Sequence, residues 1–164
     1  MGIENMQLKK GLSLLGRIWR LPWQKKLLLT EALIWLTIAR IAHMILPFRH
    51  FIKVYGVVNQ SSPQSVGQDI SFLASGICTS IMRVAAVLPF ETRCLPQSFA
   101  AQMMLSRRRI STTTYLGVHK DRKQRYSGIS GSVAHAWVRV GEKIVIGGDT
   151  ASDFTPVAQY SRSE

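Results

Sequence analysis

Apolar residues in the first two thirds of the chain recur every three or four positions, which is the spacing of an α-helix. The pattern predicts helices over residues 1–20, 24–45, 66–88 and 95–105. Pro22 stands near the start of the second helix, Pro47 follows its end, and Pro89 ends the third. Because proline fits only the first turn of a helix, Pro96 places Cys94 at the N-terminus of the fourth.

The pattern changes after residue 110, where β-branched residues and alternation replace the helical spacing. It predicts, in order, a strand, a basic loop and two hairpin strands over residues 111–118, 119–132, 133–140 and 143–147. The tail after Asp149 has no regular pattern and is predicted to be irregular. Helices followed by strands predict an α+β fold.

The chain carries 21 Lys and Arg residues against 9 Asp and Glu, a formal net charge of +12. This excess favours an acidic partner such as a peptide, a nucleic acid or a membrane surface, although solvated basic faces produce the same composition. The sequence contains no zinc-finger spacing, no aromatic RNA-binding signature and no helix-turn-helix with a basic reading helix. We therefore expect no nucleic-acid partner.

Residues 27–46 form the most apolar stretch. They include Glu31, Arg40 and His43, whose charges are costly at the centre of a bilayer, so a buried or interfacial helix is favoured over a membrane span. Residues 1–20 would form an amphipathic helix on the body of the protein or on a membrane surface. Because the start lacks a signal-peptide pattern, the predicted location is the cytoplasm, with peripheral membrane contact through the N-terminal helices left open.

Cys78 and Cys94 are the two cysteines. In a protein that is not secreted both are expected to be reduced, and one pair at this spacing makes a poor zinc site. Cys78 lies on the apolar stripe of the third helix and is interpreted as a small buried hydrophobic residue. Cys94 is the candidate nucleophile, because the positive end of a helix and the adjacent Arg93 both lower the pKa of a thiol.

A nucleophilic cysteine needs a base that a third group holds in one tautomer. His135 lies in the first hairpin strand and Asp149 at the end of the second. Each also has a simpler interpretation, since a strand histidine is often a hydrogen-bonded structural residue and an Asp after two glycines often forms a turn. The remaining histidines have no comparable partner and are interpreted as structural or surface residues: His43, His50 and His119.

The pattern of the two hairpin strands indicates whether His135 and Asp149 can lie close together. Apolar residues fall on even positions in both strands, so even residues must pair with even residues. A two-residue turn at Gly141-Glu142 would pair even with odd. A three-residue loop over 141–143 restores the match and places His135 opposite Asp149, whereas a loop over 140–142 places them diagonally. Either loop puts both side chains on one face.

The candidate residues belong to longer segments: Cys-Leu-Pro-Gln-Ser-Phe-Ala at 94–100, Tyr-Leu-Gly-Val at 115–118, Ala-His-Ala-Trp-Val at 134–138, Val-Ile-Gly-Gly-Asp at 145–149 and Phe-Thr-Pro at 154–156. Together they resemble the B-type leader peptidases of lasso-peptide biosynthesis, members of the transglutaminase-like cysteine peptidase superfamily. The resemblance spans residues 89–156, and the helical segment 27–48 is similar to the N-terminal part of that family.

The resemblance implies a nucleophile-bearing helix packed on a small antiparallel sheet, as in transglutaminase and papain cores. It also implies a single peptidase domain over 1–164, with an N-terminal helical part at 1–56 and a catalytic core at 57–164. Cys94 would attack the bond between leader and core of a precursor peptide, His135 would carry the proton and Asp149 would orient the imidazole. The chemistry needs no metal or cofactor. The backbone N–H of Cys94 would supply part of an oxyanion hole, but no glutamine lies near Cys94 on the upstream side to serve as the second donor.

Some members of the family carry a fused N-terminal domain that binds the leader. The residues before the peptidase-like region here are interpreted as helices of its own fold, which implies a separate leader-recognition protein and a macrolactam cyclase as partners. Two alternatives remain open: transglutaminase-like acyl transfer by the same three residues, and a non-enzymatic basic adaptor that binds nucleic acid or membrane.

Overall fold

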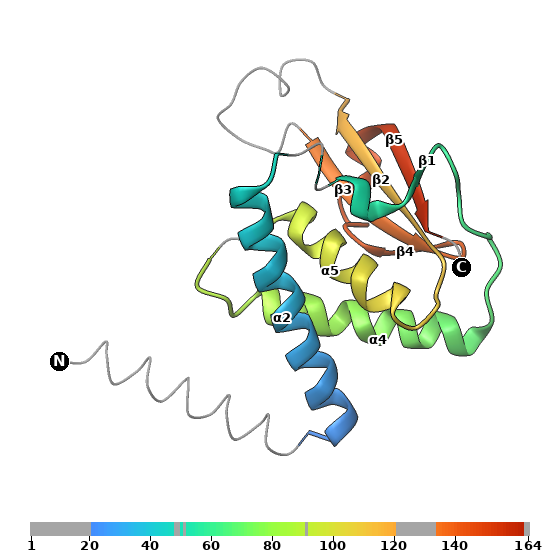
Figure 1. Ribbon diagram of the computed structural model, residues 1–164. Helices are drawn as coiled ribbons and strands as arrows, with labels where there is room; N and C mark the ends of the chain where they lie inside the picture. Colours follow the sequence, from blue (N-terminus) through green and yellow to red (C-terminus); the bar gives the residue numbers. More distant parts are fainter. Residues whose placement is uncertain (1–20, 48–49, 51, 91, 121–133, 163–164) are drawn as a thin grey trace.

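The computed structural model describes residues 21–47, 50, 52–90, 92–120 and 134–162. The predicted helix over 1–20 and most of the predicted loop over 119–132 lie outside these ranges. In these ranges three α-helices lie on one side of an antiparallel sheet (Figure 1). Helix α5 contacts both α2 and the sheet and therefore forms the middle layer. The α+β prediction is confirmed.

The helices begin and end close to the predicted residues: α2 spans Trp23–Ile45, α4 spans Gln68–Ala85 and α5 spans Cys94–Ser106. Pro96 lies in the first turn of α5, as its missing N–H requires. Two short 3-10 helices, η1 and η2, cover Ile52–Tyr55 and Ala151–Asp153.

The sheet has the strand order β1-β5-β2-β3-β4 and every pairing is antiparallel. Its strands are β1 (Val57–Val58), β2 (Thr112–His119), β3 (Ala134–Val140), β4 (Lys143–Ile146) and β5 (Phe154–Arg162).

The prediction of an irregular tail was wrong, because β5 pairs with β2 over most of its length. Pro156 argues against a strand, since it cannot donate to a sheet ladder. Here a register shift at Leu116/Gly117 accommodates it, and β1 pairs only with the far end of β5, at Tyr160 and Ser161. The N–H that Pro156 lacks is therefore not needed by β1.

The hairpin loop also differs from the prediction. Val140 pairs with Lys143 across a two-residue turn, and Gly141 there has φ +58°. The register then shifts at Val138/Arg139, so that Val138 pairs with Ile146. The strand pair thus reaches the predicted even-to-even register through a bulge at Val145 rather than through a longer loop.

The core lies between the helices and the β3–β4 hairpin. It contains Leu36 of α2, Ile77 and Cys78 of α4, Met104 of α5 and Val138 of β3. Cys78 is 2% exposed and burial raises its pKa to about 12. Its interpretation as a buried hydrophobic residue is confirmed.

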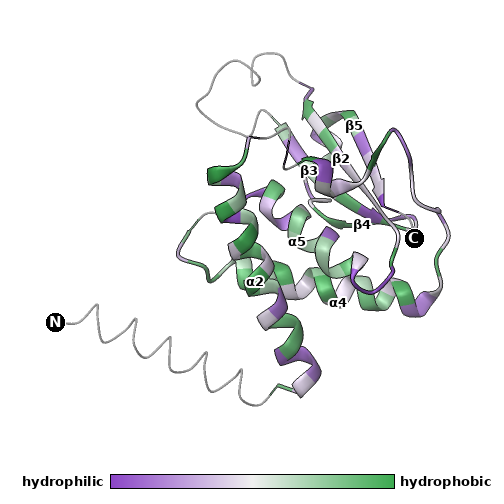
Figure 2. Ribbon diagram, viewed as in Figure 1, coloured by the Kyte–Doolittle hydropathy of each residue, from purple (hydrophilic) through white to green (hydrophobic). Residues whose placement is uncertain are grey.

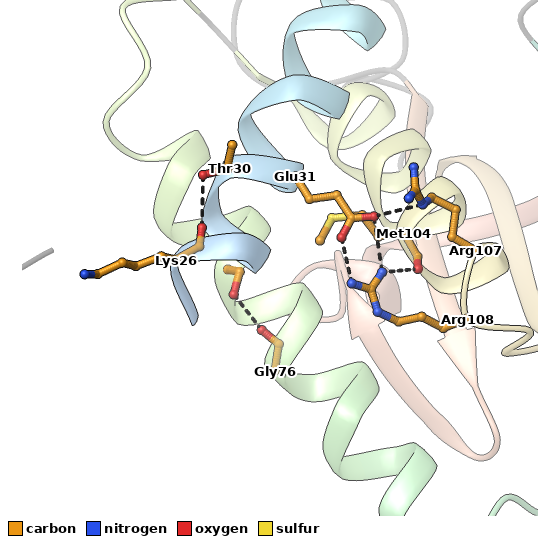
Figure 3. A network of polar contacts seen from close by, with 8 residues as sticks. Lys26, Thr30, Glu31, Gly76, Met104, Arg107 and Arg108 are labelled. Atoms are coloured by element: carbon orange, nitrogen blue, oxygen red, sulfur yellow. Dashed lines mark hydrogen bonds and ion pairs between the residues drawn. The ribbon is translucent and has the colours of Figure 1, made fainter. Parts of the chain in front are cut away.

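An ion pair fastens α2 to the end of α5 (Figure 3). The Arg108 guanidinium donates to both carboxylate oxygens of Glu31, at 2.7 and 3.2 Å, and Arg107 Nε lies 3.4 Å from the same carboxylate. Glu31 and Arg108 are mostly buried, so this bidentate pair fixes the orientation of α2 more firmly than a surface pair would.

Candidate active site

Cys94 is the first residue of α5, where backbone N–H groups have no partner within the helix. Burial by itself would raise the pKa of its thiol. A hydrogen bond with the His135 imidazole, its positive charge, and the backbone N–H groups of Ala136 and Leu95 outweigh burial. The net effect is to lower the pKa of Cys94, which favours the thiolate that acts as a nucleophile.

His135 lies near the start of β3 and is half-buried. The hydrogen bond with Cys94 raises the pKa of the imidazole, burial opposes this, and the Gly147 carbonyl adds to the rise. His135 Nε2 lies 2.8 Å from the Gly147 carbonyl oxygen and 3.3 Å from the Thr150 hydroxyl. A carbonyl only accepts, so Nε2 carries the hydrogen and Nδ1 exchanges the proton with Cys94.

The rings of Trp137 and Phe154 pack against the His135 imidazole. The Trp137 ring stacks on His135 with centroids 5.8 Å apart, and Phe154 lies 4.9 Å away at a tilt of 34°. Trp137 is itself stacked on Tyr115 at 5.6 Å. These contacts restrict rotation of the His135 ring and so keep its two nitrogens aimed at their partners.

Asp149 is brought near this pair but does not contact it. If the Val138–Ile146 register continued, Asp149 would stand opposite His135, as predicted. However, β4 ends at Ile146 and Gly147 turns the chain with φ +71°. Within the described part of the chain, the exposed Asp149 carboxylate has no hydrogen bond or ion pair. The nitrogen that Asp149 would bind in a catalytic triad, His135 Nε2, is bonded to the Gly147 carbonyl instead.

The sequence interpretation missed Tyr55, which lies beneath the first turn of α5. Its fully buried hydroxyl lies 3.1 Å from the Leu95 carbonyl oxygen and 3.0 Å from Ser98 Oγ. Burial raises the pKa of Tyr55, so the phenol stays protonated and can donate. Tyr55 therefore fixes the turn that carries Cys94. Its local sequence contains no signal of this, since the contact joins residues forty positions apart.

A cleft of about 600 Å³ opens beside Cys94 and His135. Its walls come from α2, the start of α5, β2, β3 and β5, and they are largely apolar. Besides His135, the lining includes three basic residues, Arg40, His43 and Arg93, and the described lining contains no carboxylate. The cleft therefore favours an anionic group near the thiol. His43, interpreted from the sequence as a structural or surface residue, lies at the rim of this cleft.

No three His, Cys, Asp or Glu side chains in the described ranges are grouped so as to hold a metal ion. A helix-start cysteine facing a strand histidine is typical of cysteine-dependent peptidases and acyl transferases. The chain belongs to the transglutaminase-like superfamily, whose family model matches residues 33–159. Comparison with curated proteins and with solved structures found no significant match.

Proposed function

We propose that the protein is a cysteine peptidase that removes the leader from a ribosomally made lasso-peptide precursor. The observation that carries this proposal is that Cys94 and His135 line the same open cleft, where each shifts the pKa of the other towards the charged pair. The superfamily supports cysteine chemistry in general. The narrower assignment rests on the resemblance of the segments around Cys94, His135 and Asp149 to the B-type leader peptidases.

In the proposed reaction the Cys94 thiolate attacks the carbonyl carbon of the scissile peptide bond. The backbone N–H of Cys94 helps to stabilise the oxyanion that forms. His135 gives the proton from Nδ1 to the leaving amine, which releases the core peptide and leaves the leader as a thioester on Cys94. Water, deprotonated by His135, then hydrolyses the thioester and frees the leader.

The second oxyanion donor is still unassigned. Gln97 is the nearest glutamine in sequence, but its Nε2 donates to the Thr92 carbonyl oxygen at 2.7 Å. Its amide is thus engaged on the far side of the first turn of α5.

We propose that Asp149 orients the His135 imidazole, which requires its carboxylate to reach Nε2. Its carboxylate would have to replace the Gly147 carbonyl oxygen at His135 Nε2, or reinforce that bond from a second position. Thr150, the next residue, already reaches Nε2 at 3.3 Å. A charged acceptor at this nitrogen would stabilise the imidazolium more strongly than a neutral carbonyl does.

The proposed partners are a separate leader-recognition protein and a macrolactam cyclase that acts after cleavage. The net charge of +12 would attract an acidic leader or an acidic recognition protein. Acyl transfer to an amine, as a transglutaminase performs, is the second candidate. The exposed residues at the rim, His43, Arg93 and Val157, leave the cleft open to water, which favours hydrolysis.

The test incubates the protein with the precursor peptide encoded beside its gene and with the neighbouring leader-binding protein. Mass spectrometry then identifies the products. We expect leader and core fragments with the native chain and none with Cys94→Ala or His135→Ala. Cleavage that persists in a folded Cys94→Ala protein would rule out the mechanism, and a product linked to an added amine would favour acyl transfer.

A further inference from the structure

One face of α2 presents large apolar side chains to solvent from one end of the helix to the other. Hydrophobic residues recur along the whole of α2 in the hydropathy colouring of Figure 2. At 100° per residue six of these side chains fall within an arc of about 60°, and the exposed Leu33 and Met44 lie to one side of it. Each of them is between 41% and 73% exposed. This outer stripe consists of Trp23, Leu27, Ile34, Ile38, Ile41 and Ile45.

Two threonines at the edge of the outer stripe do not interrupt its apolar character. The Thr30 hydroxyl donates to the Lys26 carbonyl oxygen at 3.0 Å (Figure 3). The Thr37 hydroxyl donates to the Leu33 carbonyl oxygen at 2.8 Å. Both hydroxyls are satisfied within the helix, so neither needs a partner from water.

The opposite face of α2 is committed to the protein. Ala32, Leu36 and Ala39 are fully buried on that face. Glu31 lies at the edge of the stripe, next to Ile38 around the helix, and is held by Arg108. Among the described residues, α2 is the one helix long and apolar enough to cross a membrane. Crossing would separate Glu31 from Arg108 and place its unpaired carboxylate in hydrocarbon, so the helix is suited to lie on a membrane rather than through it.

We propose that the outer stripe of α2 docks the protein onto the surface of an anionic lipid bilayer. The stripe from Trp23 to Ile45 is about 33 Å long, far longer than the scattered apolar residues of an ordinary monomer surface. Lys26 lies beside the stripe, on the side of Thr30 and Thr37, and the whole chain carries a net charge of +12. An apolar face on a strongly basic protein matches an acidic membrane surface.

The shape of the outer stripe also favours lipid. It is the convex surface of a single helix, and a rigid protein partner would need a matching groove over six turns. A fluid bilayer adapts to such a surface without one. Trp23 stands at one end, as is common at membrane interfaces. This proposal does not depend on the peptidase assignment.

The test is a flotation assay of the full chain with two kinds of vesicle. One consists of neutral phosphatidylcholine, and the other of phosphatidylcholine mixed with anionic phosphatidylglycerol. We expect binding to the anionic vesicles, less to the neutral ones, and weakening with salt. The double variant Ile34→Gln/Ile41→Gln should bind roughly tenfold more weakly. Val57→Gln should bind like the native chain, since Val57 is a similarly exposed apolar residue on β1, at the sheet edge.

Circular dichroism checks that the variants are folded, and Leu27→Gln/Ile45→Gln provides a second pair at the two ends of the stripe. Absence of binding to anionic vesicles would overturn the proposal, as would binding that neither pair reduces. A dimer in light scattering that either pair dissociates would show that a second copy covers the stripe instead, which also overturns it.

Discussion

His135 Nε2 lies 2.8 Å from the carbonyl oxygen of Gly147, and this contact decides which imidazole nitrogen faces Cys94. It requires a close backbone approach. Gly147 has φ +71°, and a Cβ at this position would lie 2.9 Å from Nε2 and 2.7 Å from the Ala136 carbonyl oxygen. The glycine is therefore the reason that the carbonyl can reach the ring.

Gly147→Ala should disrupt the pair of Cys94 and His135. The added methyl collides with the ring or changes the turn, so we expect cleavage to fall roughly 100-fold or more and the pKa of Cys94 to rise. Gly148→Ala is the matched control. Its φ is not positive, and the atom nearest to an added Cβ would be Ile144 Cγ2, at 3.3 Å, which is less crowded than the contacts at Gly147. Equal losses in the two variants would contradict this role of Gly147.

The pH profile should show a broad plateau. Cleavage requires the thiolate of Cys94 and the imidazolium of His135. The pKa of Cys94 is lowered, so activity should appear at a lower pH than an ordinary thiol allows. The pKa of His135 is raised, so activity should persist above the range of an ordinary imidazole.

Iodoacetamide labelling measures the acidic limb of this profile without substrate. Cys94 should be alkylated near neutral pH much faster than the buried Cys78, and His135→Ala should move the onset of Cys94 labelling to higher pH. An onset that His135→Ala leaves unchanged would mean that the imidazole does not activate the thiol.

The elements that the sequence predicted correctly are those fixed by local chemistry. Helical spacing and Pro96 place Cys94 at a helix start whatever the rest of the chain does. The even-to-even register of the hairpin follows from apolar matching, although the chain reaches it through a bulge at Val145. Strand β5 was missed because a proline is tolerated in a strand only where no neighbouring strand needs its N–H, and at Pro156 that is a property of the assembled sheet.

The rest of the candidate site depends on contacts between distant segments. Tyr55 supports Cys94 from η1, and Arg40 reaches the cleft from α2. Neither residue has a local motif, because packing of the helices on the sheet creates the contact. Asp149 was chosen from the register alone. The register predicts which residue would stand opposite His135 in an extended β4, but it does not predict that β4 ends at Ile146.

Tyr55→Phe should destabilise the fold by about 1 kcal/mol, because the Leu95 carbonyl loses a buried hydrogen bond while Ser98 still donates to it. Cleavage should fall modestly as the first turn of α5 loosens. Tyr160→Phe is the control. The Tyr160 ring is also buried, but its hydroxyl has no hydrogen-bond partner among the residues that the structure describes. Urea unfolding measures both, and equal stability of the two variants would argue against the anchoring role.

Asp149→Ala should reduce kcat/KM roughly 10- to 100-fold, far less than Cys94→Ala does. The loss is incomplete because the Gly147 carbonyl and Thr150 still hold Nε2. Asp153→Ala, in η2, tests whether any nearby carboxylate has the same effect, and it should be nearly neutral. If Asp153→Ala were the more damaging variant, the orienting role would belong to Asp153.

The basic side chains of the cleft should make Cys94 prefer anionic reagents. Iodoacetate and iodoacetamide alkylate thiolates alike but differ by one carboxylate, so the ratio of their rates at Cys94 reports the local potential. His135 is present in every variant, so its charge contributes equally to each ratio. Arg40→Met should lower it roughly threefold to tenfold, because a half-buried cation in the cleft is poorly screened.

Arg83→Met provides the matched control for Arg40→Met, since it removes the same charge from the exposed surface of α4, outside the cleft lining. Arg40→Lys should restore most of the ratio. Equal changes in Arg40→Met and Arg83→Met would mean that the overall charge of the protein, rather than the cleft, attracts the anion. A selective loss in Arg40→Met would indicate that the enzyme prefers substrates with an acidic residue close to the scissile bond, and paired peptides differing only by Glu against Gln at that position would then measure the preference as a difference in KM.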